Sequence, residues 1–161
     1  MNIKYRNPVD VGADRIANAI AATHRFVGQN LIIIDFGTAT TFCAINTKKA
    51  YLGGAILPGV RLAVDALSNN TAKLPAVDIV KVEQAIGRST IESIQSGVFY
   101  GALGACRELI QRIKNEAFAG EDVLVLATGG FASLFDKHDL YDYHLPDLVL
   151  QGVRIACEMN R

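Results

Sequence analysis

Three short motifs combine residue types that could bind phosphate or move a proton. The first, Asp35-Phe36-Gly37-Thr38, follows an apolar run and places a carboxylate before a glycine and hydroxyl groups. Backbone N–H groups of such a turn can face an anion, and Asp35 could hold a cation that offsets phosphate charge. An ordinary hairpin turn, in which threonine hydroxyls satisfy backbone groups, explains the same residues equally well.

The second motif, Thr128-Gly129-Gly130, follows another apolar run. Ligands of open α/β sheets gather beyond the carboxyl ends of the strands, and paired glycines leave room for a flat ring or a ribose. Taken alone, this motif is more typical of a glycine-rich turn between a strand and a helix.

The third motif, Gly12-Ala13-Asp14-Arg15, lies at the expected start of a helix. Its carboxylate could accept a proton, and its guanidinium could bind an anionic group through two parallel hydrogen bonds. An isolated motif of this kind is more typical of a capping carboxylate beside a solvated arginine.

Several other kinds of site are not expected. The 161 residues contain no P-loop, no dinucleotide-binding glycine motif and no nucleophile elbow, and the three histidines have no zinc-like spacing. Lys plus Arg and Asp plus Glu both number 16, which argues against a nucleic-acid partner. With no membrane-length apolar run and no signal-peptide core, we expect a cytoplasmic protein with no membrane partner. We expect Cys43, Cys106 and Cys157 to be buried apolar residues in a reducing compartment.

The elements that must position these motifs follow from hydrophobic periodicity and from turn residues. Apolar spacing predicts a helix after Gly12, with Asp10 as its N-cap, that ends near Gly28. Runs of β-branched and apolar residues predict the strands 31–34, 38–46, 50–57 and 122–127. Further helices are expected over 60–67, 89–119 and 148–159.

This order predicts an α/β fold: a ribonuclease-H-like lobe with a three-strand meander and alternating helices, preceded by the helix after Gly12. Within the longest helix, Gly97, Gly101 and Ala105 share one face. Because interior glycine weakens a helix, this face predicts close approach of another backbone or a ligand.

The motifs also occur in an order that resembles the type III pantothenate kinases. The matching segments read NIKYRNP, VGADRIANA, IIIDFGTATTF, YLGGAILPGVRL, TAKLP, IGRSTIESIQSGVFYG and LATGG. The resemblance extends over essentially the whole chain. It implies an actin-like ATPase fold of two ribonuclease-H-like lobes, and ATP-dependent phosphorylation of pantothenate to 4'-phosphopantothenate, the first step of coenzyme A biosynthesis. It further implies Mg²⁺, a monovalent cation (K⁺ or NH₄⁺) and a homodimer.

The resemblance assigns roles residue by residue. Asp14 resembles the acceptor of the pantothenate hydroxyl proton, and Asp35 resembles the ligand of the monovalent cation. The residues that resemble the pantothenate site are Tyr5, Gly12, Ala13, Asp14, Arg15 and Thr90, of which Thr90 would reach its substrate across the dimer interface. The residues that resemble the ATP site are Gly37 and Thr38 for the phosphates and Thr128, Gly129 and Gly130 for the adenosine.

Two departures from the family pattern shape the expectations. No DxGNT-type phosphate motif is present, so we expect an absent N-terminal lobe, a substrate-loop segment over 1–29 and a C-terminal lobe over 30–161. The chain alone would then lack half of its ATP cleft and would need a separate N-terminal lobe as a partner for activity. Cys43 stands where family members often carry Asp, and a small apolar side chain should be tolerated there. The alternatives are a non-catalytic dimerising or regulatory remnant, and a kinase for another small hydroxy acid.

Overall fold

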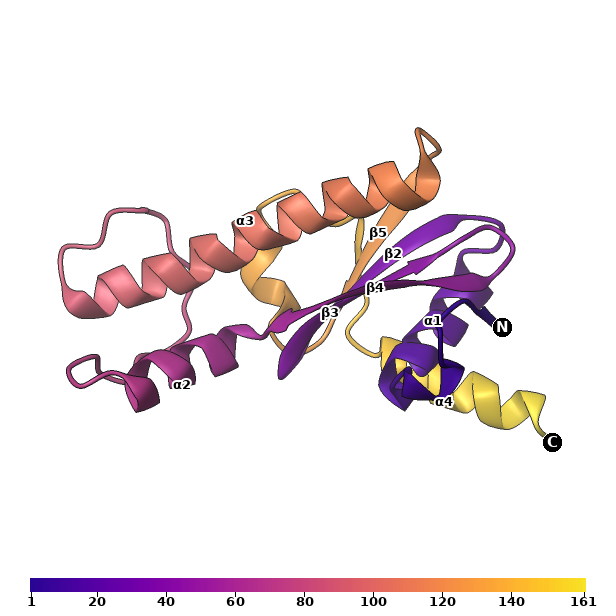
Figure 1. The fold of residues 1–161 in the computed structure, drawn as a ribbon, viewed down its shortest axis with the longest axis horizontal. Coiled ribbons are helices and arrows are strands. Elements are labelled where there is room, and N and C mark those ends of the chain that lie inside the picture. The colour runs from indigo at the N-terminus through magenta and orange to yellow at the C-terminus, as the bar shows by residue number, and fades with distance from the viewer.

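The computed structural model describes residues 1–161 as one six-stranded sheet with helices on both faces (Figure 1). The strands are β1 (Asn2–Ile3), β2 (Asn30–Phe36), β3 (Ala39–Ile45), β4 (Ala50–Pro58), β5 (Val123–Thr128) and β6 (Tyr143–His144). The helices are α1 (Ala13–Arg25), α2 (Val60–Asn70), α3 (Thr90–Phe118) and α4 (Leu148–Met159), with short 3-10 turns at Pro8–Asp10 and Ala132–Phe135.

The strand order in the sheet is β1-β4-β3-β2-β5-β6. The chain makes an antiparallel meander through β2, β3 and β4, and then crosses over through α3 to place β5 parallel to β2. This arrangement confirms the predicted α/β class and the three-strand meander. The parallel pair matters for the site, because β2 and β5 end at the same edge of the sheet.

Alternate residues of β2 serve two hydrophobic cores. Leu31 and Ile33 pack in a cluster with residues of α1 and α4, whereas Ile32 and Ile34 pack in a cluster with residues of α3. All four side chains are at most 1% exposed. The continuous apolar run therefore lies in the middle of three layers, as expected for a strand covered on both faces.

The helices α1 and α4 cover one face of the sheet and approach each other closely. A Cβ at Gly152 of α4 would overlap the backbone of Ala17 in α1, so only glycine fits at this crossing. The structure corrects one detail at the start of α1. Its N-cap is Gly12, and Asp10 belongs to the preceding 3-10 turn.

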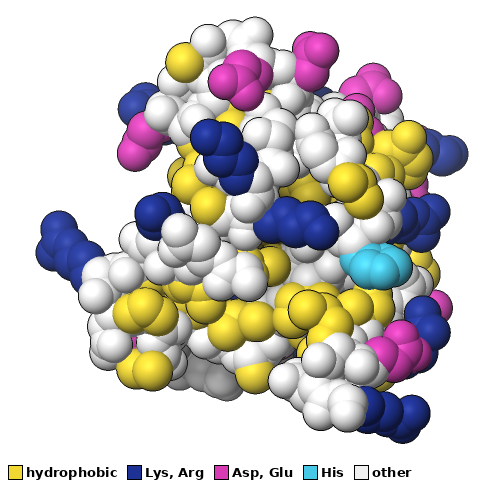
Figure 2. Space-filling model, turned by 90° about the vertical axis from the view of Figure 1, so that its right-hand side faces the viewer, with side chains coloured by type: hydrophobic (Ala, Val, Ile, Leu, Met, Phe, Trp, Pro, Cys, Tyr) yellow, Lys and Arg dark blue, Asp and Glu magenta, His cyan; other side chains and the backbone are white.

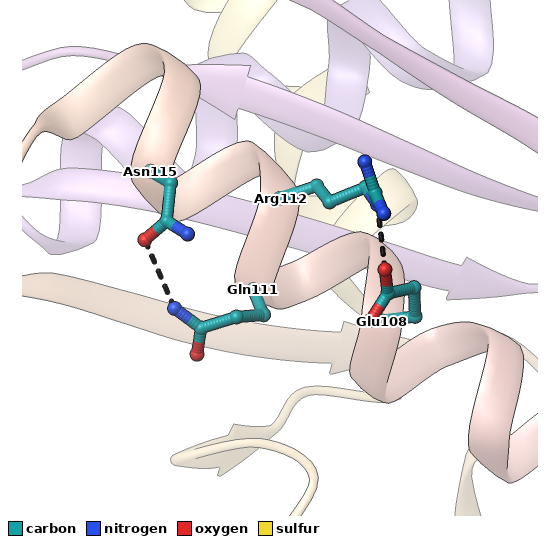
Figure 3. A network of polar contacts seen from close by, with 4 residues as sticks. All are labelled: Glu108, Gln111, Arg112 and Asn115. Atoms are coloured by element: carbon teal, nitrogen blue, oxygen red, sulfur yellow. Dashed lines mark hydrogen bonds and ion pairs between the residues drawn. The ribbon is translucent and has the colours of Figure 1, made fainter.

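The long helix α3 crosses the opposite face of the sheet. Ser89 caps it by accepting a hydrogen bond from the Glu92 N–H, and the Glu92 carboxylate accepts one from the Arg88 N–H in return. Towards its other end, exposed pairs four residues apart bond along the helix (Figure 3): Arg112 with Glu108 at 2.6 Å and Gln111 with Asn115 at 3.0 Å. Such exposed pairs contribute about 0.3–0.5 kcal/mol each, so they support the helix and not the site.

The glycines of α3 do not meet another part of the chain. A Cβ at Gly97 or Gly101 would find no atom within 4 Å. No other backbone of this chain makes the expected close approach, and approach by a ligand or another molecule stays a prediction. Both glycines instead line an apolar groove of about 630 Å³ between α2 and α3.

Some features differ from the sequence expectations. The two-residue strands β1 and β6 were not expected; each adds to an edge of the sheet through main-chain hydrogen bonds. Cys43 and Cys106 are buried as predicted, but Cys157 is exposed on α4, so the expectation that all three cysteines are buried is wrong.

None of the helices is both long and apolar enough to span a membrane.

Different helices form the two ends of the molecule. In Figure 1, α2 and the first half of α3 project at one end, and α1 and α4 lie at the other. Figure 2 views the end with α1 and α4, where hydrophobic side chains gather across the lower part of the surface among lysines and arginines. On α4 itself, Leu150 and Val153 are exposed.

Candidate functional site

The first two motifs meet at the carboxyl ends of β2 and β5. Asp35 is paired in register with Thr128, which is 1% exposed, so the turn after each strand lies beside the other. Gly129 adopts a φ of +90°, and a Cβ there would lie 2.5 Å from Asp35 Oδ1 and 2.6 Å from the backbone of Phe36. Only glycine can make this contact without strain. Gly130 is open, with no atom within 4 Å of its Cβ position.

The Asp35 carboxylate is half-buried, and its two oxygens have different neighbours. Its Oδ2 accepts a hydrogen bond of 2.9 Å from the Asn18 side-chain amide, while its Oδ1 faces Gly129 and Gly37. Burial raises the pKa of Asp35, the Asn18 bond opposes this shift, and the negative charge of Asp14 adds to it. The raised pKa means that the ionised carboxylate gains free energy from a nearby positive charge.

The third motif lies at the start of α1 and points into the same region. Asp14 is exposed in the first helical turn, where the helix dipole favours a carboxylate. A Cβ at Gly12 would lie 2.6 Å from Asp14 Oδ1, so the N-cap glycine gives this carboxylate room. The negative charge of Asp14 raises the pKa of Asp35, so the two carboxylates are close enough to repel each other.

Arg15 turns towards the segment that follows β1. Its guanidinium lies over the Tyr5 ring, 5.9 Å from the centroid, and donates to the Tyr5 hydroxyl at 3.4 Å and to the Asp10 carbonyl at 3.2 Å. These contacts hold the guanidinium beside Asp14 with part of its donor set still free. The unexpected strand β1 is what brings Tyr5 here, since it pairs with β4 next to Tyr51.

Cys43 lies in the wall behind this site. It is 2% exposed and accepts a hydrogen bond from the Tyr51 hydroxyl at 3.3 Å. Burial raises the pKa of the Cys43 thiol to about 11, so the thiol stays neutral near pH 7. Cys43 therefore behaves as the small apolar residue that the sequence predicted.

The turn that contains Gly37 and Thr38 is supported by Gly59. The Gly59 N–H donates to the Thr38 carbonyl at 3.1 Å, and a Cβ at Gly59 would overlap the carbonyls of both turn residues. Thr38 itself is exposed. The motif around Gly59 thus forms part of the wall of the site as well as a turn between β4 and α2.

Thr90 is the one predicted site residue that lies elsewhere. It is the first residue of α3, and this start of α3 lies at the end of the molecule opposite α1 (Figure 1). Thr90 lines the apolar groove between α2 and α3. Within one chain it cannot contact a ligand held by Asp14. The remaining predicted residues gather around Asp35 or Asp14.

Sequence reasoning missed Asn18. It lies four residues after Asp14 on α1 and is 1% exposed, between Ala17 and Ala19, which are also buried. A single amide within an otherwise apolar helix face is the signal that could have identified it, because buried polar groups usually have a specific partner.

The arrangement suits binding of a phosphorylated ligand together with a single proton transfer. The half-buried Asp35 carboxylate borders two glycine turns, and the exposed Asp14 carboxylate and the Arg15 guanidinium lie at the start of α1. No group of three or more His, Cys, Asp and Glu side chains forms a cage for a metal ion.

The strand order and the position of the polar residues define the fold class. The chain is a ribonuclease-H-like lobe of the actin-like ATPase type, with its polar residues at the carboxyl ends of parallel strands. A solved structure of a Campylobacter jejuni protein described as a conserved Baf family transcriptional activator matches it with a TM-score of 0.68 at 20% identity. The match covers 99% of this chain and 68% of that one, and it supports the fold alone.

The sequence profile of the type III pantothenate kinases matches residues 1–112. The chain belongs to this family. A type III pantothenate kinase of Legionella pneumophila (strain Paris) is 76% identical over 160 residues, which are 99% of this chain and 62% of that protein. Type III pantothenate kinase 1 of Francisella tularensis subsp. holarctica (strain OSU18) is 48% identical over 161 residues, 100% of this chain and 63% of that protein. The chain therefore spans less than two thirds of these relatives.

Proposed function

We propose that this chain forms the part of a pantothenate kinase that accepts the substrate proton and holds part of the ATP. The reaction is ATP-dependent phosphorylation of pantothenate to 4'-phosphopantothenate, in the first step of coenzyme A biosynthesis. The observation that carries the proposal is that Asp35 and the Gly129 turn meet at the carboxyl ends of β2 and β5, and that Asn18, one helical turn after Asp14, bonds to Asp35. The family suggests the reaction and the residue roles, and the geometry around Asp35 supports them.

Asp14 is the proton acceptor in this proposal. Phosphoryl transfer depends mainly on in-line placement and charge neutralisation, so the protein needs a positioned base and fixed positive charge. The exposed Asp14 carboxylate would accept the pantothenate hydroxyl proton. Arg15, held by Tyr5, would bind the substrate carboxylate with its free donors, and Gly12 and Ala13 would let the substrate approach the start of α1.

The nucleotide would lie along the two glycine turns. Gly37 and Thr38 would bind phosphate oxygens, and Thr128, Gly129 and Gly130 would border the adenosine, where the open side of Gly130 leaves space. Asp35 suits a monovalent cation, K⁺ or NH₄⁺, because it is one half-buried carboxylate and no cage of several carboxylates is present. ATP-bound Mg²⁺ would supply further charge neutralisation to the phosphates.

A second copy of the chain is the proposed occupant of the groove between α2 and α3. The groove is apolar, Gly97 and Gly101 leave it open, and Thr90 lines it at the end of the molecule away from Asp14. If two copies pack their grooves together, Thr90 of one copy can approach the pantothenate of the other. Sedimentation tests this: Gly101→Leu should convert dimer to monomer, while Gly104→Leu, on the same helix outside the groove, should not. Unchanged dimerisation of Gly101→Leu would contradict the proposal.

The rest of the ATP cleft would come from the part of the protein that this chain does not span, which we propose is an N-terminal lobe. We define the completed enzyme as this chain joined to the part of the 76% identical Legionella relative that lies outside the match. The completed enzyme is expected to be cytoplasmic, like other enzymes of soluble small metabolites.

The test is phosphate transfer from ATP in the presence of K⁺ or NH₄⁺. The completed enzyme should phosphorylate pantothenate in preference to a panel of other small hydroxy acids, and the chain alone should not. Preference for another acid would move the proposal to a different substrate. Phosphorylation of no acid in the panel would favour a non-catalytic, dimerising protein.

A further inference from the structure

Asn18 combines deep burial with a single useful contact. It is 1% exposed, and its only side-chain hydrogen bond runs from Nδ2 to Asp35 Oδ2 at 2.9 Å. Its Oδ1 atom is buried and has no hydrogen-bond partner at all. An amide in this environment costs stability compared with an apolar residue of similar size, because half of its hydrogen-bonding capacity is lost.

The contact links two elements that the reaction needs in a fixed relation. Asn18 lies one helical turn after Asp14 on α1, and Asp35 ends β2. The bond therefore ties the helix that carries the proton acceptor to the strand end that borders the nucleotide turns. No other side-chain hydrogen bond joins α1 to β2.

The bond also selects which oxygen of Asp35 faces the cleft. With Oδ2 held by Asn18, Oδ1 is turned towards Gly129 and Gly37, whose Cβ positions lie 2.5 Å and 3.5 Å from it. A carboxylate without this bond could rotate about its side-chain torsions, and the oxygen beside the glycine turns would lose its fixed place.

We propose that Asn18 is a positioning residue for the proposed kinase reaction. Its amide fixes the Asp35 carboxylate so that Oδ1 faces the glycine turns, and the same bond holds α1 in place against β2. The inference rests on the proposed function for its consequence in catalysis. Its structural part, the placement of Asp35, is independent of any substrate.

Two variants and one control test it. Asn18→Leu removes the amide and fills a similar volume, and Asn18→Asp keeps the shape but replaces the donor with a charge that repels Asp35. The control is Thr23→Val: Thr23 is also buried on α1, but its hydroxyl donates only to carbonyls of its own helix, at 2.8 and 3.2 Å. It should lower thermal stability without moving Asp35.

Crystal structures of the chain and kinetics of the completed enzyme are the two readouts. In Asn18→Leu we expect Asp35 to leave its place beside Gly129 or to occupy two conformers. In the kinetics we expect kcat to fall about tenfold or more, the size of one charge-assisted hydrogen bond, with KM for pantothenate little changed. Thr23→Val should retain kcat, which separates positioning from a loss of stability.

The two readouts fail separately. If Asp35 keeps its position in Asn18→Leu, the inference is overturned whatever the kinetics show. If the completed wild-type enzyme is active and Asn18→Leu retains its kcat, the inference is overturned as well. If the completed wild-type enzyme phosphorylates nothing, the proposed function fails, and the position of Asp35 in the variant crystals still decides the role of Asn18.

Discussion

Substitution of Gly129 by alanine should destabilise the protein strongly, although the added group is one methyl. The methyl carbon would lie 2.5 Å from Asp35 Oδ1 and 2.6 Å from both the N and C atoms of Phe36, and the residue would keep a φ of +90°. The backbone conformation costs about 1–2 kcal/mol for alanine. Displacing a packed strand end costs about 1–3 kcal/mol more. Together these give roughly 2–5 kcal/mol.

The next residue supplies the matched control. Gly130 is exposed, has no atom within 4 Å of its Cβ position and is not among the glycines with positive φ, so Gly130→Ala should change stability by less than about 0.5 kcal/mol. Urea unfolding followed by circular dichroism measures both variants. At roughly 2–4 °C per kcal/mol for a chain of this size, Gly129→Ala should also melt about 4–20 °C lower. Equal stability of the two variants would refute the contact between the Gly129 turn and Asp35.

Two further predictions concern the packing and the thiols. Gly152→Ala should destabilise the chain by about 1–3 kcal/mol, because the added methyl would overlap the backbone of Ala17. Gly104→Ala in α3, where the methyl would meet no atom within 4 Å, should instead stabilise it by about 0.5–1 kcal/mol. The reverse order of the two stabilities in urea unfolding would contradict the packing of α1 on α4. At pH 8 a thiol reagent should label Cys157 alone, because burial raises the pKa of Cys43 to about 11 and of Cys106 to about 12 and keeps both protonated. Labelling of more than one thiol in the folded protein would contradict the burial of Cys43 and Cys106. In the unfolded chain both thiols ionise near their ordinary pKa of 9.0, so their contribution to the free energy of unfolding is present below that pH and is lost as the pH rises towards 11.

The strands and helices could be predicted because their signals are local. The apolar run of β2, the apolar and β-branched residues of β3 and β4, and the apolar spacing of α3 each indicate their element within a few residues. The two-residue strands β1 and β6 carry no such signal, since they form only by bonding to an edge that the rest of the sheet provides.

The site was predictable in its parts and not in its connections. Asp35 and Thr128 could each be placed at the end of a predicted strand, but their position side by side follows only from the parallel pairing of β2 with β5. The bond from Asn18 depends on how α1 crosses the sheet, and that crossing depends on the contact of Gly152 with Ala17, far apart in the chain. The glycines of α3 indicate that space is needed, without indicating whether this chain or another molecule uses it.

Asp14 is the proposed acceptor of the pantothenate hydroxyl proton, and a comparison of two variants tests this role. The variants are Asp14→Asn and Asp147→Asn in the completed enzyme, since both residues are exposed carboxylates at the start of a helix, and Asp147 makes no side-chain cap hydrogen bond. With pantothenate and ATP saturating, Asp14→Asn should lower kcat by about 10²-fold or more while Asp147→Asn leaves it nearly unchanged. Equal kcat values for the two variants would contradict the account.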